Sequence, residues 1–336
     1  MTASAARLEG CDLPSRARCS APGKLMLLGE YAVLEGHPAL AMCLDRRIAC
    51  EAEVIPDSTR LLIESEQVFP VPFDLPTSAL DQVQPPAPEL RLLWPVLRAH
   101  APREGGLSIR FEADFPPTWG LGSSSASTLA AAGALRAVTG KAAIGAEVFR
   151  EVHSAQRSLQ GAASGYDVAT QLLGGYVVFS DDGLAAMDRV EPPPSSALHW
   201  VVAWTGRKAD TGDMIRDVAS RFPVGHPLYA EIGALALRGV ESLRSGDLEA
   251  LGQALSEGQG LLDTLGAVPN DLAERITTLQ ESPSILGARL SGAGGGDCIL
   301  VLASDRDGAI TTCEKQGFEV LPLAPELRGL IEEEVR

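Results

Sequence analysis

The chain has 336 residues, 45% of them hydrophobic and 21% charged, which is typical of a globular protein with room for two compact domains rather than of a disordered chain. Its net charge of −16 argues against nucleic-acid binding, and no stretch is apolar enough to span a membrane. The six cysteines contain no C-x-x-C pair, which argues against a zinc site or disulfide framework and favours buried thiols in a reducing cytoplasm.

The first part of the chain alternates between short apolar runs and turn residues. Residues up to about Arg18 contain no apolar segment, so they predict a loose tail rather than a signal peptide. The apolar runs that follow predict strands at 24–36, 44–55 and 107–115. A proline-rich stretch at 74–90 predicts a surface excursion before a helix around Leu90 to Arg98, in which we expect Trp94 to pack in the core.

The middle of the chain predicts three helices and a strand before a proline-rich break. The helices begin after Gly122, near Gly145 and at Asp167, and the strand begins at Tyr176. The segment "EPPPSSA" at 191–197 is typical of an interdomain linker. It predicts an N-terminal domain at 1–190 and a C-terminal domain at 191–336.

The second half predicts a strand, amphipathic helices and a closing glycine turn. The strand covers 198–206, and two or three helices follow between Asp213 and Glu281, with N-caps at Asp247 and Asn270. A glycine-rich turn then leads into a strand, a helix and a final strand. Because strands and helices mix without regular alternation, we expect α+β layers in each half.

The loop Gly120-Leu121-Gly122-Ser123-Ser124-Ser125 comes directly before an alanine-rich helix. Free amides and the helix dipole at such a start attract anions, and glycines let the backbone close around phosphate oxygens. A glycine turn with a serine N-cap would have the same sequence without any ligand. The loop is not a Walker A motif, since no Gly-Lys-Ser/Thr follows, and Ser125 at the third glycine position excludes a dinucleotide fingerprint.

Two further segments have a similar character. The glycine turn at 291–297 leads into a strand rather than a helix, which counts against a Rossmann fold. The segment "APGKLMLLGEYAVLEGHPAL" at 21–40 places Lys24, one of only four lysines, in a Pro-Gly-Lys turn at the head of a strand. Taken singly, a tight loop and a solvated lysine explain these two features without any ligand.

Together, the three segments resemble the GHMP kinase family. Pro-Gly-Lys-(x)4-Gly-Glu, Pro-x-x-x-Gly-Leu-Gly-Ser-Ser-Ser-Ala and Ser-Gly-Ala-Gly-Gly-Gly occur in that order along nearly the whole chain. The resemblance implies a two-domain α+β fold, with an N-terminal domain like ribosomal protein S5 domain 2 and a ferredoxin-like C-terminal domain. It also implies a cytoplasmic small-molecule kinase, monomeric or homodimeric, that binds ATP and Mg²⁺ in the cleft between the domains.

Finer details of the motifs bear on the acceptor. Tyr31 stands where mevalonate kinases usually carry histidine, and the segments at 164–169, 201–211 and 291–298 look closer to those of phosphomevalonate kinases. The resemblance therefore implies phosphorylation of 5-phosphomevalonate to 5-diphosphomevalonate, with mevalonate kinase as the alternative.

Phosphoryl transfer depends on positioning and charge neutralisation, and this suggests roles for two residues. We expect Lys24 to bridge the transferred phosphoryl group and the acceptor. Asp167 would orient Lys24 or the acceptor, and would act as the base if the acceptor is a hydroxyl. A helix N-cap is the structural alternative for Asp167.

The binding residues implied by the resemblance fall into three groups. ATP phosphates would contact Gly120, Leu121, Gly122, Ser123, Ser124, Ser125 and Ala126. Magnesium would contact Ser124 and Asp167. The acceptor would contact Tyr31, Ser164, Gly165, Arg207, Lys208, Ser291, Gly292, Ala293 and Gly294. For Arg207 and Lys208 an exposed pair is the alternative to gripping a phosphate, and for Tyr31 the alternative is burial on a backbone partner.

Readings from other classes fit less well. A ligand sensor of the same fold without catalysis would be expected to have lost the lysine, the aspartate or the serine loop, and all three are present. A nucleotide-dependent oxidoreductase is disfavoured by the order of loops and elements. The related decarboxylase of the mevalonate pathway lacks the Gly-Glu-Tyr/His bend of the first motif.

Overall fold

The computed structural model describes residues 14–335 except 66, 70, 103–104, 161–162, 182–184 and 195–196. The strands are β1 (Arg16–Leu28), β2 (Ala39–Ile55), β3 (Arg60–Glu64), β4 (Phe73–Pro76), β5 (Gly106–Ala113), β6 (Tyr176–Asp181), β7 (Ala185–Val190), β8 (His199–Trp204), β9 (Ile285–Leu290), β10 (Cys298–Ala303), β11 (Glu319–Leu321) and β12 (Ile331–Glu333). The α-helices are α1 (Trp94–His100), α2 (Ser123–Val138), α3 (Ala146–Gln160), α4 (Tyr166–Leu173), α5 (Thr211–Arg221), α6 (Pro227–Ser245), α7 (Leu248–Thr264), α8 (Asn270–Gln280) and α9 (Arg306–Lys315). Short 3-10 turns are η1 (Ala32–Glu35), η2 (Thr77–Asp81), η3 (Pro88–Leu90) and η4 (Pro117–Trp119).

The first sheet is built around the long strand β2. Its main path runs β12-β1-β2-β5-β3-β4, and β6 pairs with β2 and β7. Strand β2 pairs with β1 along almost its whole length, with β6 at 39–42 and with β5 at 48–55. With 17 residues it is long enough for β6 and β5 to pair with successive parts of it.

Helix α2 packs on this sheet against β1 and β2 and forms the centre of the core. It is buried continuously from Ser125 to Val138, and six of the fourteen residues in this stretch are alanine. Small side chains let the helix approach the sheet closely. At Gly133 a Cβ atom would come within 3.0 Å of Cys19 Sγ on β1. The alanine-rich composition is therefore a packing requirement of this position.

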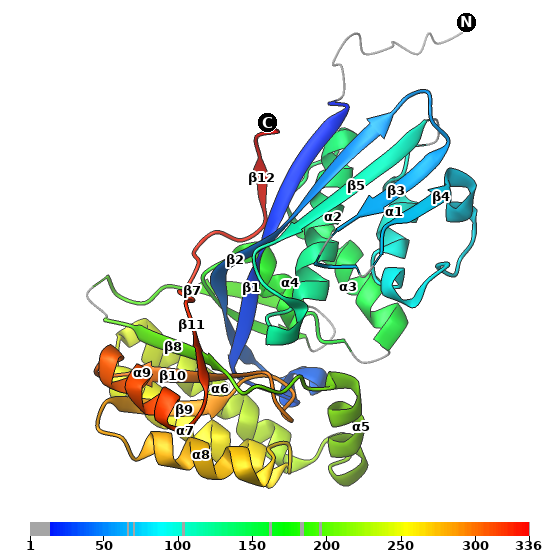
Figure 1. Ribbon diagram of the computed structural model, residues 1–336. Helices are drawn as coiled ribbons and strands as arrows, with labels where there is room; N and C mark the ends of the chain where they lie inside the picture. The colour runs from blue at the N-terminus through cyan, green and yellow to red at the C-terminus, as the bar shows by residue number, and fades with distance from the viewer. Residues whose placement is uncertain are drawn as a thin grey trace, which may run out of the picture.

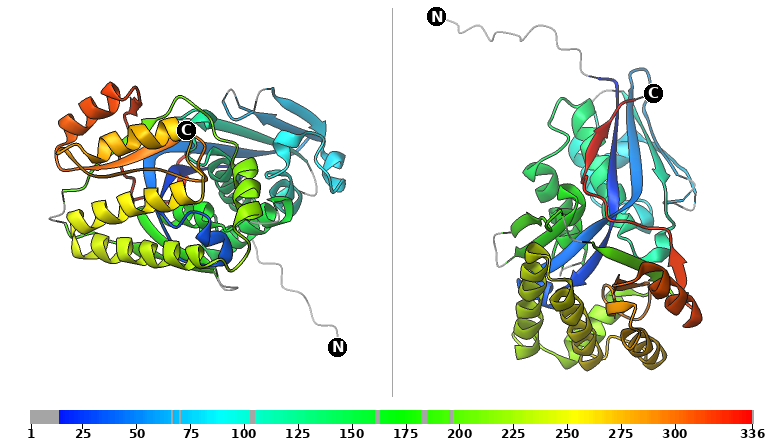
Figure 2. Two further views of the ribbon diagram at one scale, coloured as in Figure 1. Left: turned by 90° about the horizontal axis from the view of Figure 1, so that it is seen from below. Right: turned by 90° about the vertical axis from the view of Figure 1, so that its left-hand side faces the viewer.

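The second sheet has four antiparallel strands in the order β11-β8-β10-β9. Helices α7 and α8 contact β9, and α9 contacts β8 and β11. Helix α6 contacts α7 and also reaches the first sheet at β1 and β2. Figures 1 and 2 show the two layered units in contact, with the yellow and orange helices gathered around the second sheet.

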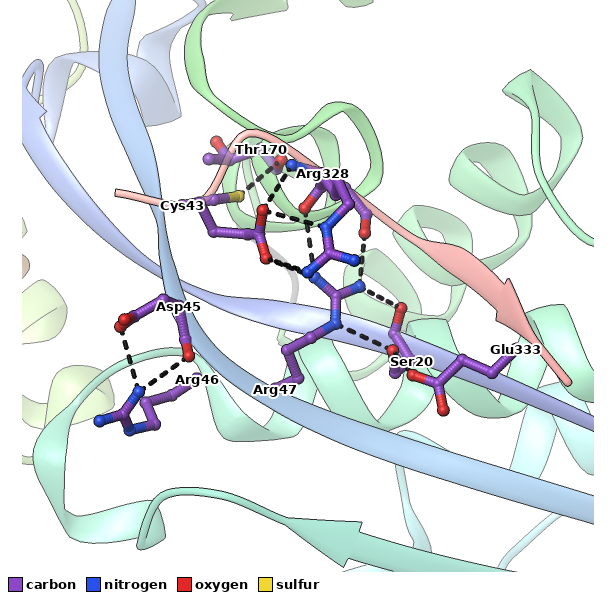
Figure 3. A network of polar contacts seen from close by, with 10 residues as sticks. Ser20, Cys43, Asp45, Arg46, Arg47, Thr170, Arg328 and Glu333 are labelled. Carbon is purple, nitrogen blue, oxygen red and sulfur yellow. Dashed lines mark hydrogen bonds and ion pairs between the residues drawn. The ribbon is translucent and has the colours of Figure 1, made fainter. Parts of the chain in front are cut away.

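The C-terminal strap, residues 322–333, crosses from the second sheet back to the first and ends in β12 beside β1 (Figure 1, red). Arg47 on β2 holds it by donating to the carbonyls of Arg328 and Gly329 at 3.2 and 2.6 Å (Figure 3). The backbone amide of Leu330 also donates to the carbonyl of Leu172 in α4, at 3.2 Å. The strap thus fastens β2, α4 and the second sheet together.

Several predicted elements need correction. Strand β1 begins at Arg16 and runs through the Pro-Gly-Lys segment to Leu28, with a register shift between Pro22 and Gly23, so Lys24 lies inside a strand rather than at its head. The predicted tail, up to about Arg18, therefore overlaps the start of β1, and its residues 1–13 lie outside the described part. Four helices, not two or three, fill the span from α5 to α8. Asp247 is an N-cap, accepting from Ala250 N at 2.9 Å, whereas the cap of α8 is Pro269.

Two predictions drawn from composition hold for the described residues. Trp94 is 1% exposed and donates from Nε1 to the carbonyl of Gln82, so it packs in the core. Cys19, Cys43, Cys50, Cys298 and Cys313 are buried free thiols, and Cys11 lies outside the described residues. Within those residues no helix combines the length and apolar character needed to cross a membrane.

Candidate functional site

A cleft of about 400 Å³ lies where the three glycine-rich segments meet. The starts of α2 and α4 open into it, together with the turn at 291–297 from the second sheet. Lys24 reaches it from β1, and Lys208 from the segment between β8 and α5. Segments that are far apart in the sequence thus converge on one cavity.

The start of α2 presents free backbone amides to this cleft. Gly122, its N-cap, has φ of 75°, and among the described residues no side chain caps the helix. The carbonyl of Gly122 is occupied, because Ser125 Oγ and Gln171 Nε2 both donate to it at 3.0 Å. Because no described side chain caps them, the amides of the first turn are left to hold an anion, as expected of a phosphate loop.

Lys24 lies beside this loop because its backbone amide bonds to the loop and its side chain packs against Gly122. Its amide donates to the carbonyl of Leu121 at 2.9 Å, and a Cβ on Gly122 would lie 2.8 Å from Lys24 Cε. The side chain is only 8% exposed. Burial opposes its charge, but the neighbouring Tyr166 and Asp167 more than offset this, and the pKa of Lys24 lies above its ordinary value. Lys24 is thus a buried cation at the phosphate loop.

Asp167 lies in the first turn of α4 and lines the same cleft. Its Oδ2 accepts a hydrogen bond from Gln156 Nε2 at 2.9 Å, and its Oδ1 accepts one from the Val168 amide at 2.9 Å. The N-cap of α4 is Gly165, with φ of 86°, so Asp167 is not the cap. Its carboxylate instead faces the region of Lys24, where it can orient a cation or take a proton.

The glycine turn at 291–297 is fastened to the first motif. Ser291 Oγ donates to the carbonyl of Met26 at 2.8 Å, and the amide of Gly292 donates to Glu30 Oε1 at 3.3 Å. Glu30 is also ion-paired with Arg289 at 2.5 Å, and both side chains are almost fully buried. The Gly-Glu bend of the first motif therefore positions the third motif across the cleft.

Asp297 is a cleft residue that sequence reasoning did not assign. It has φ of 62°, and with Tyr31 it is one of the two non-glycine residues with positive φ in the described part of the chain. Its Oδ1 accepts from the Ala209 amide at 3.0 Å, and burial raises its pKa. The unusual conformation in a cleft is a signal that only the structure provides.

Most of the expected site residues line the cleft. They are Lys24, Gly120, Gly122, Ser123, Ser124, Ser125, Ser164, Gly165, Asp167, Lys208, Ser291, Gly292 and Ala293. The structure also adds Gln156 and Tyr166 to this lining.

Five expected residues do not line the cleft. The Arg207 guanidinium forms a two-pronged ion pair with Asp271 on the surface. Tyr31 is 6% exposed and donates from its hydroxyl to the carbonyl of Ala293, so it supports the glycine turn from beneath. The remaining three are buried in the fold: Leu121, Ala126 and Gly294. For Arg207 and Tyr31, the structure supports the structural alternatives.

A second cavity of about 230 Å³ adjoins the cleft at the serine loop. Ser123 and Ser124 line both cavities, while Phe69, Leu93 and Phe115 give the second one an apolar wall. An apolar recess next to a phosphate loop suits a flat aromatic base.

The residues present also fit a nucleotide bound with magnesium. No cluster of three or more His, Cys, Asp or Glu side chains suited to a metal occurs among the described residues. Magnesium bound with a nucleotide needs only one or two protein ligands, because phosphate oxygens and water complete its coordination. Ser124 and Asp167, which both line the cleft, supply oxygens of that kind.

Comparison with known proteins gives matches along most of the chain. Residues 90–175 match the family "GHMP kinases N terminal domain" and residues 240–315 match "GHMP kinases C terminal". A mevalonate kinase of Aeropyrum pernix is 30% identical over 294 residues, covering 85% of this chain and 88% of that protein. A mevalonate kinase of Thermococcus gammatolerans is 29% identical over 322 residues, covering 88% and 92%. The crystal structure of the Lin0012 protein from Listeria innocua superposes with a TM-score of 0.80 at 20% identity, covering 95% and 100%.

Proposed function

This chain belongs to the GHMP kinase family, and from that premise we propose that it is a mevalonate kinase, which transfers a phosphoryl group from MgATP to a hydroxyl of mevalonate. Its fold is the two-domain α+β fold of that family. The two mevalonate kinases described above are similar along most of both chains, and they favour this acceptor over the phosphorylated one implied by the short motifs.

The observation that carries the proposal is the placement of Asp167 beside Lys24 in the cleft. A hydroxyl acceptor has a proton that must leave during transfer, and a carboxylate within the cleft can accept it. Bound MgATP supplies the phosphoryl group and the metal charge. Lys24 then offers a buried ammonium to the negative charge shared between donor and acceptor.

The remaining cleft residues would orient the two substrates. We propose that the amides at the start of α2 hold the phosphates of ATP, with the adenine base in the adjoining apolar cavity. Ser124 and Asp167 would hold magnesium. The turn from Ser291 to Ala293 would close the acceptor side through backbone amides, supported by Tyr31.

A second candidate, phosphomevalonate kinase, is favoured by Lys208. This residue lines the cleft, where its ammonium could bind the phosphate of a phosphorylated acceptor. Arg207, the other cation expected to grip that phosphate, is directed to Asp271 instead. Because only Lys208 of the two expected cations lines the cleft, phosphomevalonate kinase is the weaker candidate.

The test is ADP release by purified protein with MgATP and either mevalonate or 5-phosphomevalonate, offered in parallel. We expect turnover with mevalonate, and about 10²–10⁴-fold slower turnover after Asp167→Asn, because the hydroxyl proton then has no base. Turnover with 5-phosphomevalonate alone would contradict the proposal and establish the second candidate. A modest loss in Asp167→Asn would point in the same direction, since a phosphate acceptor needs no strong base.

A further inference from the structure

The side-chain amide of Gln156, on α3, has a hydrogen-bond partner for only one of its two polar groups among the described residues. Its side chain is 4% exposed and lines the cleft. Nε2 donates to Asp167 Oδ2 at 2.9 Å, whereas Oε1 is buried with no hydrogen-bond partner among the described residues. The orientation of the amide follows from chemistry, because an ionised carboxylate only accepts and so must face the NH₂ group.

The unpartnered oxygen carries a cost that packing alone does not explain. A buried acceptor without a donor loses its hydration and gains nothing in return. The neighbouring α3 residues Val152 and Ala155 are apolar and buried, so a methionine of similar size would suit the position without that cost. Among the described residues, the side chain of Gln156 gains its hydrogen bond from Asp167 alone.

We infer that Gln156 is a positioning residue for the transfer reaction, whose amide fixes the carboxylate of Asp167 in the orientation that faces the acceptor. The inference rests on the proposed function, in which Asp167 takes the acceptor proton. The two oxygens of Asp167 are held from two helices, Oδ2 by α3 and Oδ1 by the Val168 amide of α4. This holds the plane of the carboxylate as well as its position.

A neutral donor suits this role better than a charged residue. A glutamate at 156 would present a second carboxylate to Asp167 and, when ionised, could not donate a hydrogen bond to it. A lysine would form its own ion pair with Asp167 and compete with Lys24. An amide orients the carboxylate and leaves its charge available to the cleft.

The first test compares wild type with Gln156→Met. We expect kcat to fall about 10–100-fold with an unchanged KM for ATP, because a misoriented base costs that much. Thermal stability should not fall, since the variant also removes an unsatisfied oxygen. The control is Gln280→Met, because Gln280 is partly buried and donates from Nε2 to the carbonyl of Ala288 at 2.7 Å without lining the cleft. That control should lose stability and keep kcat; an unchanged kcat in Gln156→Met would overturn the inference.

The second test does not depend on the identity of the acceptor. A crystal structure of ligand-free Gln156→Met should show the Asp167 carboxylate turned away from its wild-type orientation. If wild type transfers phosphate to neither acceptor, the proposed function fails, and this structure alone decides whether Gln156 positions Asp167. An Asp167 carboxylate that keeps its orientation in the variant would overturn the inference even in an active kinase.

Discussion

Lys24 is a cation enclosed by the protein, with 8% of its surface exposed. Such a charge is stable only with partners, and the carboxylates of Asp167 and Asp297 are among those that keep its pKa raised. Because the ammonium faces the cleft, we expect Lys24→Met to fold and to turn over about 10²–10³-fold more slowly, the cost of removing one electrostatic contact to the transferred group. Steady-state kinetics with saturating ATP measures this loss.

The control for this substitution is Lys315→Met, which removes an exposed lysine at the end of α9. It changes the net charge equally and should leave turnover unchanged. If Lys24→Met retained wild-type turnover while folding normally, Lys24 would have no part in the transfer, and the cleft would need another source of positive charge.

Single residues also show where sequence reasoning reaches its limit. The motif order predicted Lys24, Asp167 and the serine loop as site residues, since each lies in a short segment of unusual composition, and all of them line the cleft. The direction of a side chain depends on partners distant in sequence. Arg207 turns away because Asp271 lies within reach, 64 residues further along the chain. Asp297 received no role in the site, because its positive φ and its place in the cleft leave no trace in residue type.

Helix α2 and the loop before it act as one element, and Gly122 joins them. Its φ of 75° favours glycine, and a Cβ atom there would lie 2.8 Å from Lys24 Cε. We expect Gly122→Ala to lose about 1–2 kcal/mol in free energy of unfolding from the left-handed conformation. It should also lose most turnover, because Lys24 must move. Urea unfolding and steady-state kinetics measure the two losses.

Gly225→Ala separates the two effects. Gly225 has φ of 77°, and a Cβ atom there would meet nothing within 4 Å. This variant should therefore show a similar loss of stability with unchanged turnover. Equal turnover in the two variants would mean that the contact between Gly122 and Lys24 has no role in catalysis.

Elements with strong local signals were predictable, and elements made by distant pairing were not. The alanine-rich α2 and the apolar strand β8 both follow from composition and periodicity. Strands β4 and β12 have four and three residues, too few to show a period, and each forms because a partner strand is present. Strand β12 pairs with β1 across more than 300 residues, a relation that no local pattern contains.

At the scale of the whole molecule, the C-terminal strap connects the second sheet to the first. Glu326 forms an ion pair with Arg47 of β2, with 3.6 Å between the charged atoms, and Glu333 accepts a hydrogen bond from Arg18 of β1. Burial alone would raise the pKa of each glutamate, but the hydrogen bonds and nearby arginines outweigh it, and both pKa values lie below the ordinary 4.5. The strap is therefore held by carboxylates that favour the folded state when ionised.

A carboxyl group whose pKa is lower in the folded state than in the unfolded state stabilises the fold at pH values above its unfolded pKa. This contribution is lost as the pH falls through the folded pKa, which for both glutamates lies below 4.5. We expect the double variant Glu326→Gln with Glu333→Gln to be about 1–2 kcal/mol less stable than wild type at pH 7. The two proteins should converge towards pH 3, since wild type then loses the same charges. Urea unfolding across this range measures both curves, with the exposed Glu249→Gln as the control that should follow wild type throughout. A constant difference from pH 7 to pH 3 would mean that the strap is held by its backbone contacts and by Arg47 rather than by its carboxylates.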